Sequence, residues 1–516
     1  MSMQSYRYII IGTGVAGASA AEGIRQIDNS SPVLLIGREP QLPYHRPPLS
    51  KQLWFGKKKP ADIFVHDEAW YRQNGIDVAV DTTITAINPD SRTVVDQRNN
   101  SFRYEKLLLA TGGQPRMLGI PGGDMPEIFY FRTLDDYTRL RQLAIAGTKA
   151  LVIGGGFIGS EMAAALRTAR VDVTMLFPDP SLVPNVFPAS LSQAITRNYK
   201  ERRVRILAGD TPAVIRRSGR GFAVETRNGQ RIDCDWVVAG IGIVPEMHLA
   251  SGIGLQVGNG VVVNEHLQSS DPNIFAAGDN ALFPYEALGY DTRVEHWDNA
   301  VEQGRCAGRN MAGAGQPYTH MPYFFSDLFD FGYEAVGAVH GLQTFADWRK
   351  ENDTGVIYHL LNGRVRGVML CNVWGKVDAA RELIRQDRTW TPAELRGLIR
   401  DEAWQKEERL SLAAEKSQPV TKATPPLSPD EAEKLAHDVP DWMLRGNALE
   451  RDFKFRDFDQ AMGFVNRVAD VAREEDHHPD ISVSYNKVHL ALSTHKIGGL
   501  TKNDFIVAAK INQLAQ

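Results

Sequence analysis

Cysteine pairs are absent from this sequence. Its three cysteines, Cys234, Cys306 and Cys371, lie far apart and form no CxxC or CxxxxC motif. Neither a disulfide framework nor a redox-active dithiol is indicated. Chemistry that depends on a reversible protein disulfide is therefore not expected.

The sequence also has little excess charge and no long apolar run. Lysine and arginine number 58, aspartate and glutamate 62, and the formal net charge is −4. This balance indicates no general attraction to nucleic acid or to an anionic membrane. The apolar stretch 8–21 is broken by three glycines, lacks a basic leader and is too short to span a bilayer. We expect a cytoplasmic protein with no nucleic-acid or membrane partner.

Two glycine-rich turns of the GxGxxG type occur in the chain, each between an apolar run and a helix-like segment. Their glycines are Gly12, Gly14 and Gly17 in the first turn, and Gly154, Gly156 and Gly159 in the second. Such a turn lets a pyrophosphate lie against a helix N-terminus. About 20 residues beyond each turn stands an acid, Glu39 or Asp179, which can bind ribose hydroxyls. This pattern indicates a flavoprotein, with FAD at the first turn and a nicotinamide dinucleotide at the second.

The 516 residues exceed what one hydrophobic core can organise, and the length indicates about three or four domains. Alternating strands and helices predict two α/β, Rossmann-like nucleotide-binding domains. We expect the FAD-binding domain to be discontinuous, over 1–115 and 246–320, with the NAD-binding domain over 116–245. A small α+β domain is expected over 321–410.

A change of composition marks a boundary near the C-terminal end. The segment 411–427 is small, polar and contains prolines, which is typical of a linker. A helix should begin directly after it, because Ser428 can cap, Pro429 suits the first helical position and Glu431 lies three residues beyond the cap. The remaining residues, 428–516, suffice for one small independent domain.

Five motifs together carry a resemblance to a known family. They are LPYHRPPLSK at 42–51, LATG at 109–112, GGGFIGSE at 154–161, AGD at 277–279 and VEHW at 294–297. The chain from about 6 to 400 resembles the ferredoxin-reductase and apoptosis-inducing-factor family of FAD-dependent NAD(P)H oxidoreductases. The resemblance implies a fold of the glutathione-reductase type. Without a cysteine pair, electrons would pass from the flavin directly to an acceptor.

The resemblance implies roles for individual residues. Asp279 resembles the aspartate that holds the ribityl chain, and Lys51 and Glu161 correspond to a catalytic pair beside flavin N5. As alternatives, Lys51 is a solvated loop residue and Glu161 only complements the helix dipole. The other implied cofactor contacts are Arg46, Thr111, Gly112, Phe157, Ile158, Glu295, His296, Trp297 and Phe325.

Three of these residues carry more specific expectations. Arg46 lies with Lys51 on the same proline-restricted loop, and a cation near flavin N5 or N1 would favour the anionic reduced flavin. The resemblance makes Phe157 a ring that shields the flavin face until nicotinamide displaces it, whereas a plain packing role is the alternative. Phe325 would cover the active site where the family often has tryptophan.

The choice of nicotinamide cofactor is expected to depend on Asp179. This carboxylate follows the predicted strand 173–177, and no lysine or arginine follows it until Arg197. A carboxylate at this place binds a 2′-hydroxyl and repels a 2′-phosphate. The sequence therefore favours NADH over NADPH.

The C-terminal domain shows a second resemblance. Over about 428–516, the motifs DHHPD at 476–480, YNKVH at 485–489 and LSTH at 492–495, with Asp504, closely resemble pterin-4a-carbinolamine dehydratase. The implied catalytic residues are His477, His478 and His495, with Asp504 orienting one of them. Dehydration of a 4a-hydroxytetrahydropterin removes hydroxide from pterin atom C4a and a proton from N5. Both steps need groups that titrate near neutrality, and histidine is such a group.

The same residues allow two alternatives to an acid–base site. The paired histidines and Asp504 can serve as helix-end residues, and three histidines with an aspartate can bind zinc. The family precedent is metal-free, so no metal is expected. Arg473 and Ile481 depart from the residues common among relatives, which bears on pterin affinity and substrate range.

The joined domains predict a bifunctional enzyme. The dehydratase would form quinonoid dihydropterin, and the flavin half would reduce it to tetrahydropterin with NADH; a short linker would raise its local concentration. One alternative is an NADH-dependent reductase of a ferredoxin- or rubredoxin-type partner with an appended dehydratase. Another is an apoptosis-inducing-factor-like redox sensor whose pterin-binding module dimerises the chain. A homo-oligomer is expected.

Overall fold

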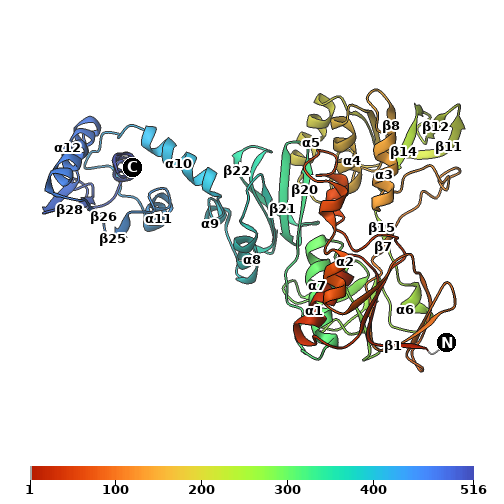
Figure 1. Cartoon of the computed structure of the whole chain (residues 1–516). Coiled ribbons are helices and arrows are strands. Elements are labelled where there is room, and N and C mark those ends of the chain that lie inside the picture. The colour runs from red at the N-terminus through yellow and green to blue at the C-terminus, as the bar shows by residue number, and fades with distance from the viewer. Residues whose placement is uncertain (1–2, 516) are drawn as a thin grey trace. The chain divides into compact units, whose positions relative to one another are not determined.

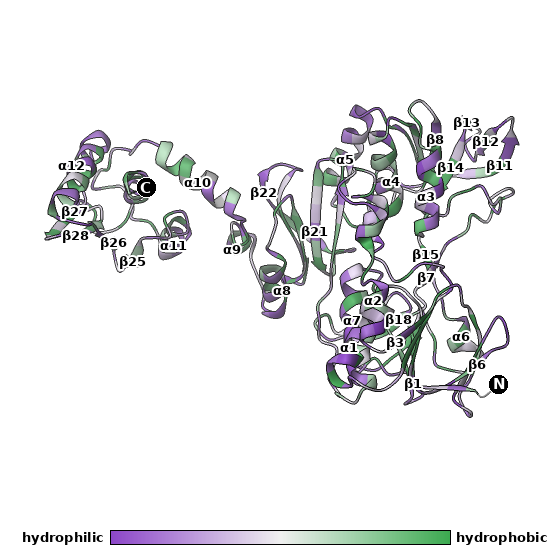
Figure 2. Ribbon diagram, viewed as in Figure 1, coloured by the Kyte–Doolittle hydropathy of each residue, from purple (hydrophilic) through white to green (hydrophobic). Residues whose placement is uncertain are grey.

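The computed structural model describes residues 3–515, except for the side chains at 405 and 407–409. It divides the chain into two compact units, Met1–Leu395 and Arg396–Gln516 (Figure 1). Figure 2 shows that apolar residues concentrate in the central strands of the first unit, around β1 and β6. No helix within 3–515 combines the length and apolar character needed to cross a bilayer.

The first sheet of the N-terminal unit carries the first glycine turn at one strand end. Its strand order is β3-β2-β1-β6-β5-β4, with β17 also paired to β6, and the strands β3, β2, β1, β6 and β17 are parallel. The bounds are β1 (Gln4–Ile11), β2 (Val33–Ile36), β3 (Ile76–Ala79), β4 (Ile84–Asn88), β5 (Thr93–Asp96), β6 (Ser101–Leu109) and β17 (Ile274–Ala276). Strand β17 returns from far along the chain, so the first domain is discontinuous.

Two helices of this domain are packed unusually close together, α1 (Val15–Ile27) and α7 (Trp297–Met311). A Cβ at Gly304 would lie 2.2 Å from the carbonyl oxygen of Ala16, and one at Gly308 would lie 2.0 Å from that of Ala20. The backbones meet because glycines stand at these contacts. The contact holds α7, which follows His296, against the helix that begins at the first glycine turn.

The second domain repeats the arrangement on a four-stranded parallel sheet. Its strand order is β10-β9-β8-β14, and an antiparallel sheet β11-β12-β13 is attached. The bounds are β8 (Lys149–Ile153), β9 (Asp172–Phe177), β10 (Arg205–Ala208), β11 (Pro212–Ser218), β12 (Gly221–Thr226), β13 (Arg231–Cys234) and β14 (Trp236–Ala239). The antiparallel pair β7 (Gly113–Pro115) and β15 (Ile243–Pro245) forms the two crossings to the first domain.

Short elements complete the two nucleotide-binding domains. The helices are α2 (Glu68–Gln73), α3 (Leu134–Leu143), α4 (Phe157–Thr168), α5 (Ala189–Glu201) and α6 (His248–Gly252). The 3-10 helices are η1 (Pro47–Ser50) and η2 (Pro60–Ile63). The remaining small sheet has the order β16-β18-β19, formed by β16 (Val261–Val262), β18 (Ala281–Tyr285) and β19 (Tyr290–Thr292).

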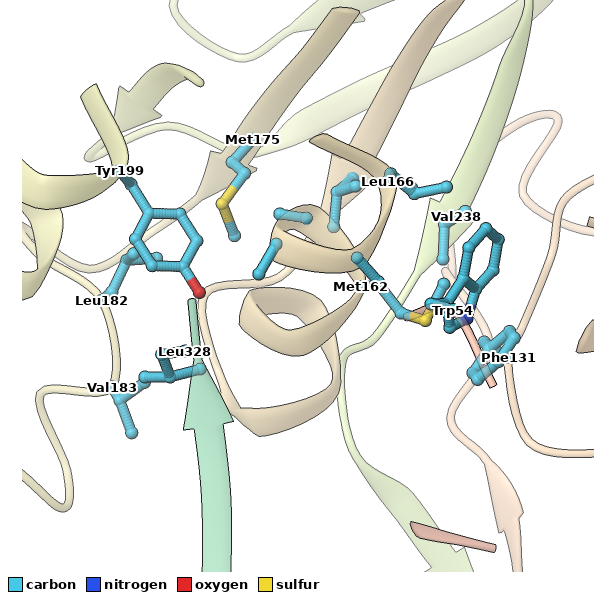
Figure 3. Close-up of a cluster of buried hydrophobic side chains, with 14 of the residues drawn as sticks. Trp54, Phe131, Met162, Leu166, Met175, Leu182, Val183, Tyr199, Val238 and Leu328 are labelled. Carbon is cyan, nitrogen blue, oxygen red and sulfur yellow. The ribbon is translucent and has the colours of Figure 1, made fainter. Parts of the chain in front are cut away.

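The third domain is an antiparallel five-stranded sheet of order β20-β21-β24-β23-β22. Its elements are β20 (Tyr323–Leu328), β21 (Phe331–Gly337), β22 (Gln343–Lys350), β23 (Thr354–Leu361), β24 (Arg364–Cys371), α8 (Val377–Arg385) and α9 (Pro392–Leu395). Helix α4 lies in a core shared by all three domains: Figure 3 shows Met162 beside Trp54 of the first domain, and Leu328 of the third on the opposite side. This packing fixes α4, the helix that carries Glu161.

The C-terminal unit is an α+β fold, as expected from the sequence. Its antiparallel sheet has the order β25-β26-β28-β27 and packs on helices α12 and α13. The elements are α10 (Glu402–Ala414), α11 (Pro429–Ala436), β25 (Met443–Arg445), β26 (Ala448–Lys454), α12 (Phe458–Glu475), β27 (Asp480–Ser484), β28 (Lys487–Leu492) and α13 (Lys502–Leu514). The predicted capping box of α11 is confirmed, since Ser428 and Glu431 bond each other's backbone N–H.

The segment expected to be a free linker at 411–427 belongs to this C-terminal unit. The unit begins at Arg396, and Leu412 and Ala413 of α10 are buried in its core. Further along, the backbone N–H of Leu427 donates to the carbonyl oxygen of Leu500 at 2.8 Å. Polar, proline-containing composition indicated a linker, but the apolar residues at its start and its backbone groups find partners on the domain that follows.

Candidate active sites

The first glycine turn has one position that faces open space. A Cβ at Gly12 would lie 2.0 Å from the carbonyl oxygen of Ala110, and its φ of +124° strains any other residue. A Cβ at Gly17 would lie 1.9 Å from the carbonyl oxygen of Gly12, whereas nothing lies within 4 Å of a Cβ at Gly14. Packing therefore requires Gly12 and Gly17, and Gly14 leaves room for a ligand.

The second turn reproduces this geometry. A Cβ at Gly154 would lie 2.3 Å from the carbonyl oxygen of Gly240, and one at Gly159 would lie 2.1 Å from that of Gly154. A Cβ at Gly156 meets nothing within 4 Å. Helices α1 and α4 begin directly after Gly14 and Gly156, and neither has a side-chain cap. Both helix starts therefore present backbone N–H groups that suit a pyrophosphate.

Both turns line one cavity of about 1080 Å³. Every residue that the sequence predicted as a cofactor contact lines this cavity, except Gly17 and Gly159, which pack behind the turns. The residues present fit two dinucleotides that meet within one space, because each turn offers an open glycine and an uncapped helix N-terminus.

Lys51 and Glu161 form a buried ion pair at the wall of the cavity. Nζ of Lys51 lies 2.8 Å from Oε1 of Glu161, and their side chains are 7% and 5% exposed. Ser326 Oγ donates to Oε1 and Ser50 Oγ to Oε2 of the same carboxylate, each at 2.5 Å. The expected ion pair is thus confirmed. Sequence reasoning missed both serines, although Ser50 adjoins Lys51 in the PPLSK motif and Ser326 adjoins Phe325.

Phe325 covers the side of the Lys51 ammonium group that does not contact Glu161. Nζ of Lys51 lies 4.7 Å from the centroid of the Phe325 ring, a cation–π distance, and 3.5 Å from the carbonyl oxygen of the same residue. Phe325 therefore packs on the lysine. Phe325 and its neighbour Phe324 both line the cavity.

Arg46 lines the cavity and contacts the predicted ribose-binding acid. Its guanidinium pairs with Glu39 and donates to the carbonyl oxygen of Arg132 at 2.8 Å. Burial raises the pKa of Glu39, but Arg46 and the Tyr44 hydroxyl outweigh it and lower that pKa, so the carboxylate is charged. Arg46 therefore neutralises the predicted ribose-binding acid, which lies just beyond the end of β2.

Asp279 has a partner that the sequence did not reveal. Arg132 Nη2 lies 2.7 Å from Oδ2 of Asp279, and both residues line the cavity. Arg293 donates to the backbone carbonyl of Asp279 and pairs with Glu295 at 2.6 Å. Burial raises the pKa of Glu295, although Arg293 opposes this shift. Two acids at this wall are thus balanced by two arginines, of which Arg132 comes from a segment distant in sequence.

Aromatic rings form the wall between the two nucleotide sites. The ring of His296 stacks on Phe324 with centroids 4.3 Å apart, and Phe157 meets Phe324 edge-on at 5.5 Å. Burial lowers the pKa of His296 to about 4, so its ring is neutral near neutrality. Trp297 Nε1 donates to Nδ1 of His45 at 2.9 Å. Phe157 is half-buried in this wall, where it adjoins the second glycine turn.

Asp179 and Thr111 occupy opposite halves of the cavity. Asp179 is half-buried just beyond β9 and lines the half formed by the second glycine turn. Thr111 Oγ1 donates to the carbonyl oxygen of Glu246 at 2.8 Å and accepts from Asn280. The Thr111 side chain therefore secures the domain crossing, while Gly112, with φ of +65°, turns the chain beside it.

The C-terminal unit joins His477 to Asp504. Nε2 of His477 lies 2.7 Å from Oδ1 of Asp504, and these residues are 8% and 0% exposed. Oδ2 of Asp504 accepts from the Thr501 backbone N–H at 2.7 Å and from Thr494 Oγ1 at 2.8 Å. Asp504 thus contacts one predicted catalytic histidine and is also a capping residue of α13. Thr494 and Thr501 were missed, although Thr494 directly precedes His495.

The other two predicted histidines lie at the surface. His478 is exposed, and His495 pairs with Asp480 at 3.3 Å, with both side chains 69% exposed. The left-handed residue Asp476, φ +49°, ends α12 and turns His477 inward while its neighbour points out. Across the described part of the chain, no three histidine, cysteine, aspartate or glutamate residues form a group that could hold a metal ion.

Comparison with known families matches three regions of the chain. Residues 6–304 match the family described as pyridine nucleotide-disulphide oxidoreductase. Residues 307–354 match the C-terminal region of apoptosis-inducing factor, mitochondrion-associated, and 425–514 match pterin 4 alpha carbinolamine dehydratase. The three cysteines are free and buried, so the name of the first family does not describe a dithiol here.

Curated relatives resemble the N-terminal unit. The ferredoxin–NAD(+) reductase component of the anthranilate 1,2-dioxygenase system of Burkholderia cepacia is 33% identical, over 76% of this chain and 97% of the relative. Putidaredoxin reductase of Pseudomonas putida is 35% identical, over 64% of this chain and 80% of the relative. Both alignments leave part of this chain uncovered.

Solved structures show the same likeness. A ferredoxin reductase from Rhodopseudomonas palustris superposes with a TM-score of 0.71 at 30% identity, covering 75% of this chain and 96% of that one. The covalent putidaredoxin reductase–putidaredoxin complex gives a TM-score of 0.71 at 32% identity, covering 80% and 100%. The chain therefore belongs to the pyridine nucleotide-disulphide oxidoreductase family and joins that oxidoreductase to a pterin-4a-carbinolamine dehydratase domain.

Proposed function

We propose that the N-terminal unit uses FAD and NADH, and that its electrons reduce the pterin that the C-terminal unit produces. The observation that carries the first part is the single cavity in which two open glycine turns meet the buried Lys51–Glu161 pair. FAD would lie on Gly14, with its ribose hydroxyls near Glu39, and NADH on Gly156.

FAD, when bound, supplies a ring that accepts a hydride and passes electrons on. The protein's own contribution is electrostatic and steric. Lys51 places a fixed positive charge at the cavity wall, and Glu161, held by two serine hydroxyls, keeps that ammonium in place. The rings of Phe157 and Phe324 cover the junction of the two nucleotide sites and can exclude water from it.

NADH is the nicotinamide cofactor that we propose. The support is Asp179, which lines the cavity just beyond β9. In a dinucleotide-binding domain, an acid at the end of this strand binds the adenosine ribose. A carboxylate at that place accepts hydrogen bonds from a 2′-hydroxyl and repels the charge of a 2′-phosphate.

We propose that the C-terminal unit removes water from a 4a-hydroxytetrahydropterin. The C4a–O bond breaks as the leaving hydroxyl takes a proton, and loss of the N5 proton completes the C4a=N5 double bond. His477, buried and held by Asp504, is suited to one of these proton transfers. The exposed His478 and His495 are suited to meeting the substrate, and no metal is required.

The product of this dehydration, quinonoid dihydropterin, is a two-electron acceptor. Its reduction to tetrahydropterin consumes one NADH and one proton and yields NAD⁺. Placing both activities in one chain would shorten the life of this unstable product by raising its local concentration. The tetrahydropterin could be tetrahydrobiopterin or a related pterin with the same ring.

The decisive experiment is stopped-flow oxidation of the NADH-reduced full-length protein by quinonoid dihydropterin, by a ferredoxin and by oxygen in parallel. The proposal expects the pterin to oxidise the protein fastest. Oxidation by ferredoxin at a much higher rate would reject pterin as the acceptor.

A small iron–sulfur protein is the second candidate acceptor. The supporting observation is that several relatives at 30% identity or more are ferredoxin reductases, and that a putidaredoxin reductase solved in a covalent complex with putidaredoxin is 32% identical to this chain. In that case the dehydratase would act independently, and its product would leave the reduced protein unoxidised in the same stopped-flow experiment.

A further inference from the structure

A buried carboxylate in the C-terminal unit has no part in the proposed acid–base chemistry. Glu475 is the last residue of α12, and its side chain is 0% exposed. Its oxygens contact Nζ of Lys510 at 2.5 Å, Nζ of Lys416 at 3.1 Å and the backbone N–H of Ser417 at 2.8 Å. Glu475 therefore ties the end of α12 to helix α13 and to the segment that precedes the dehydratase family match.

The same segment makes two further contacts with the unit. The Asn503 side-chain amide donates to the carbonyl oxygen of Gln418 at 2.7 Å and accepts from its backbone N–H at 2.9 Å. Nζ of Lys496 donates to the carbonyl oxygen of Val420 at 2.7 Å. Residues 416–420 thus form a strap across the unit, held at three places.

Each place at which the strap is held adjoins a residue of the proposed active site. Glu475 is separated from His477 only by the left-handed turn at Asp476. Asn503 directly precedes Asp504, and Lys496 directly follows His495. The strap therefore contacts the chain beside both members of the His477–Asp504 pair.

We propose that the strap, residues 416–420, positions His477 and Asp504 for dehydration, with Glu475 and Asn503 as the positioning residues. This inference rests on the proposed roles of His477 and Asp504. Glu475 fixes the turn from which His477 enters the interior, and Asn503 fixes the first turn of α13, from which Asp504 reaches it.

The physical reason is the cost of disturbing buried charge. Burial raises the pKa of Glu475, but Lys510, the Ser417 N–H and Lys416 lower it to about 2, so the carboxylate stays charged near neutrality. A buried charge that loses its partners must move or draw in water. A displacement of about 1 Å at a catalytic group can cost about 10²-fold in rate.

The test is Glu475→Gln in the full-length protein. The change keeps the shape but removes the charge that holds both lysines. We expect kcat for dehydration to fall by about 10- to 100-fold with KM little changed. The imidazole ¹⁵N resonance of His477 should move to one new position. A single shifted resonance indicates a displaced ring in a folded unit, whereas partial unfolding would add a second resonance from the unfolded chain.

Glu415→Gln is the matched control. Glu415 pairs with Lys502 at 2.6 Å near the same segment, but the two side chains are 41% and 51% exposed. This substitution should leave kcat and the His477 resonance unchanged. An unchanged His477 resonance and kcat in Glu475→Gln would overturn the proposal, as would an equal loss in Glu415→Gln.

Asn503→Ala decides the question if Glu475→Gln does not fold. It removes both contacts with Gln418 without burying an unpaired charge, and the proposal expects it to lower kcat and shift the His477 resonance. Unchanged values in a folded Asn503→Ala would overturn the strap. If the wild-type chain dehydrates no pterin, the proposed function fails, whereas the His477 resonance still reports whether the strap holds the ring.

Discussion

Asp504 contacts His477 with one carboxylate oxygen and uses the other to close the N-terminus of its own helix. The first contact is 2.7 Å, and the second oxygen accepts from the Thr501 backbone N–H. The carboxylate therefore cannot rotate without breaking the contact with the histidine or the helix cap. Because both oxygens of Asp504 are engaged, its carboxylate has a fixed position and holds the His477 ring in one orientation.

Removal of His477 should affect both chemistry and stability, because it leaves one oxygen of the buried Asp504 carboxylate without its partner. We expect His477→Ala to lower dehydratase kcat by about 10²–10⁴-fold, the typical contribution of a general acid or base. Asp504→Ala should lower kcat and also cost about 1 kcal/mol or more through the lost cap. Steady-state dehydration and urea unfolding measure the two effects. A Thr501→Ala variant should show the stability loss with most of the activity, and equal activity losses in all three variants would contradict this division.

Glu161→Gln should lower the stability of the N-terminal unit, because it leaves the buried Lys51 without its charged partner. Breaking a buried ion pair on one side typically costs about 3–5 kcal/mol. We expect a lower Tm and a reduction of bound flavin by NADH that is slower by about 10-fold or more, since Lys51 is no longer held in place. Glu68→Gln removes a pair that is about 80% exposed and should change neither quantity. Normal flavin reduction in Glu161→Gln would rule out a role for the pair in that step.

Asp179→Ala should weaken the preference for NADH. The loss of a carboxylate at the adenosine ribose removes a hydrogen-bond acceptor for NADH and a repulsion for NADPH. The ratio of kcat/KM for NADPH to that for NADH should rise by about tenfold. Steady-state kinetics with both cofactors measure it. Asp172→Ala, at the exposed start of β9, is the control. A wild-type enzyme that already prefers NADPH would refute the assignment.

Stability of the C-terminal unit should depend on pH through Glu475. Its folded-state pKa of about 2 lies below the ordinary value of 4.5, because the lysines and the Ser417 N–H favour the charged form. The unfolded chain thus binds the proton more readily, and this stabilisation is full above about pH 4.5 and is lost as the pH falls toward 2. Urea unfolding of wild type and Glu475→Gln should show a difference in free energy of unfolding that is smaller at about pH 3 than at about pH 7. A constant difference would contradict the pKa shift.

Fragments of the C-terminal unit should differ according to where they begin. A fragment of residues 396–516 keeps Leu412, Ala413 and the strap, and should fold and dehydrate. A fragment beginning at residue 428 lacks them and should have a lower Tm and a lower kcat. Circular dichroism melts and dehydration assays compare the two. Equal activity of the shorter fragment would show that 396–427 contribute nothing to the site.

Local sequence determined the elements that depend on neighbours along the chain. The two glycine turns are of this kind, because the φ of Gly12 and Gly154 and the close approach of Gly17 and Gly159 follow from a strand, a tight turn and a helix in succession. The capping box that begins at Ser428 is another. These features could be predicted because their partners lie within a few residues.

Tertiary structure alone decided which side chains meet across the fold. Ser326 reaches Glu161 over 165 positions, and Arg132 reaches Asp279 over 147, so no local pattern marks either pair. Arg46 shares a loop with Lys51 yet pairs with Glu39. In the sequence, Glu475 looks like an ordinary charged residue at the exposed end of a helix. It is buried because the strap and α13 cover it in the folded unit. Each outcome depends on how strands and helices distant in sequence pack, because burial and charge pairing are properties of the assembled core.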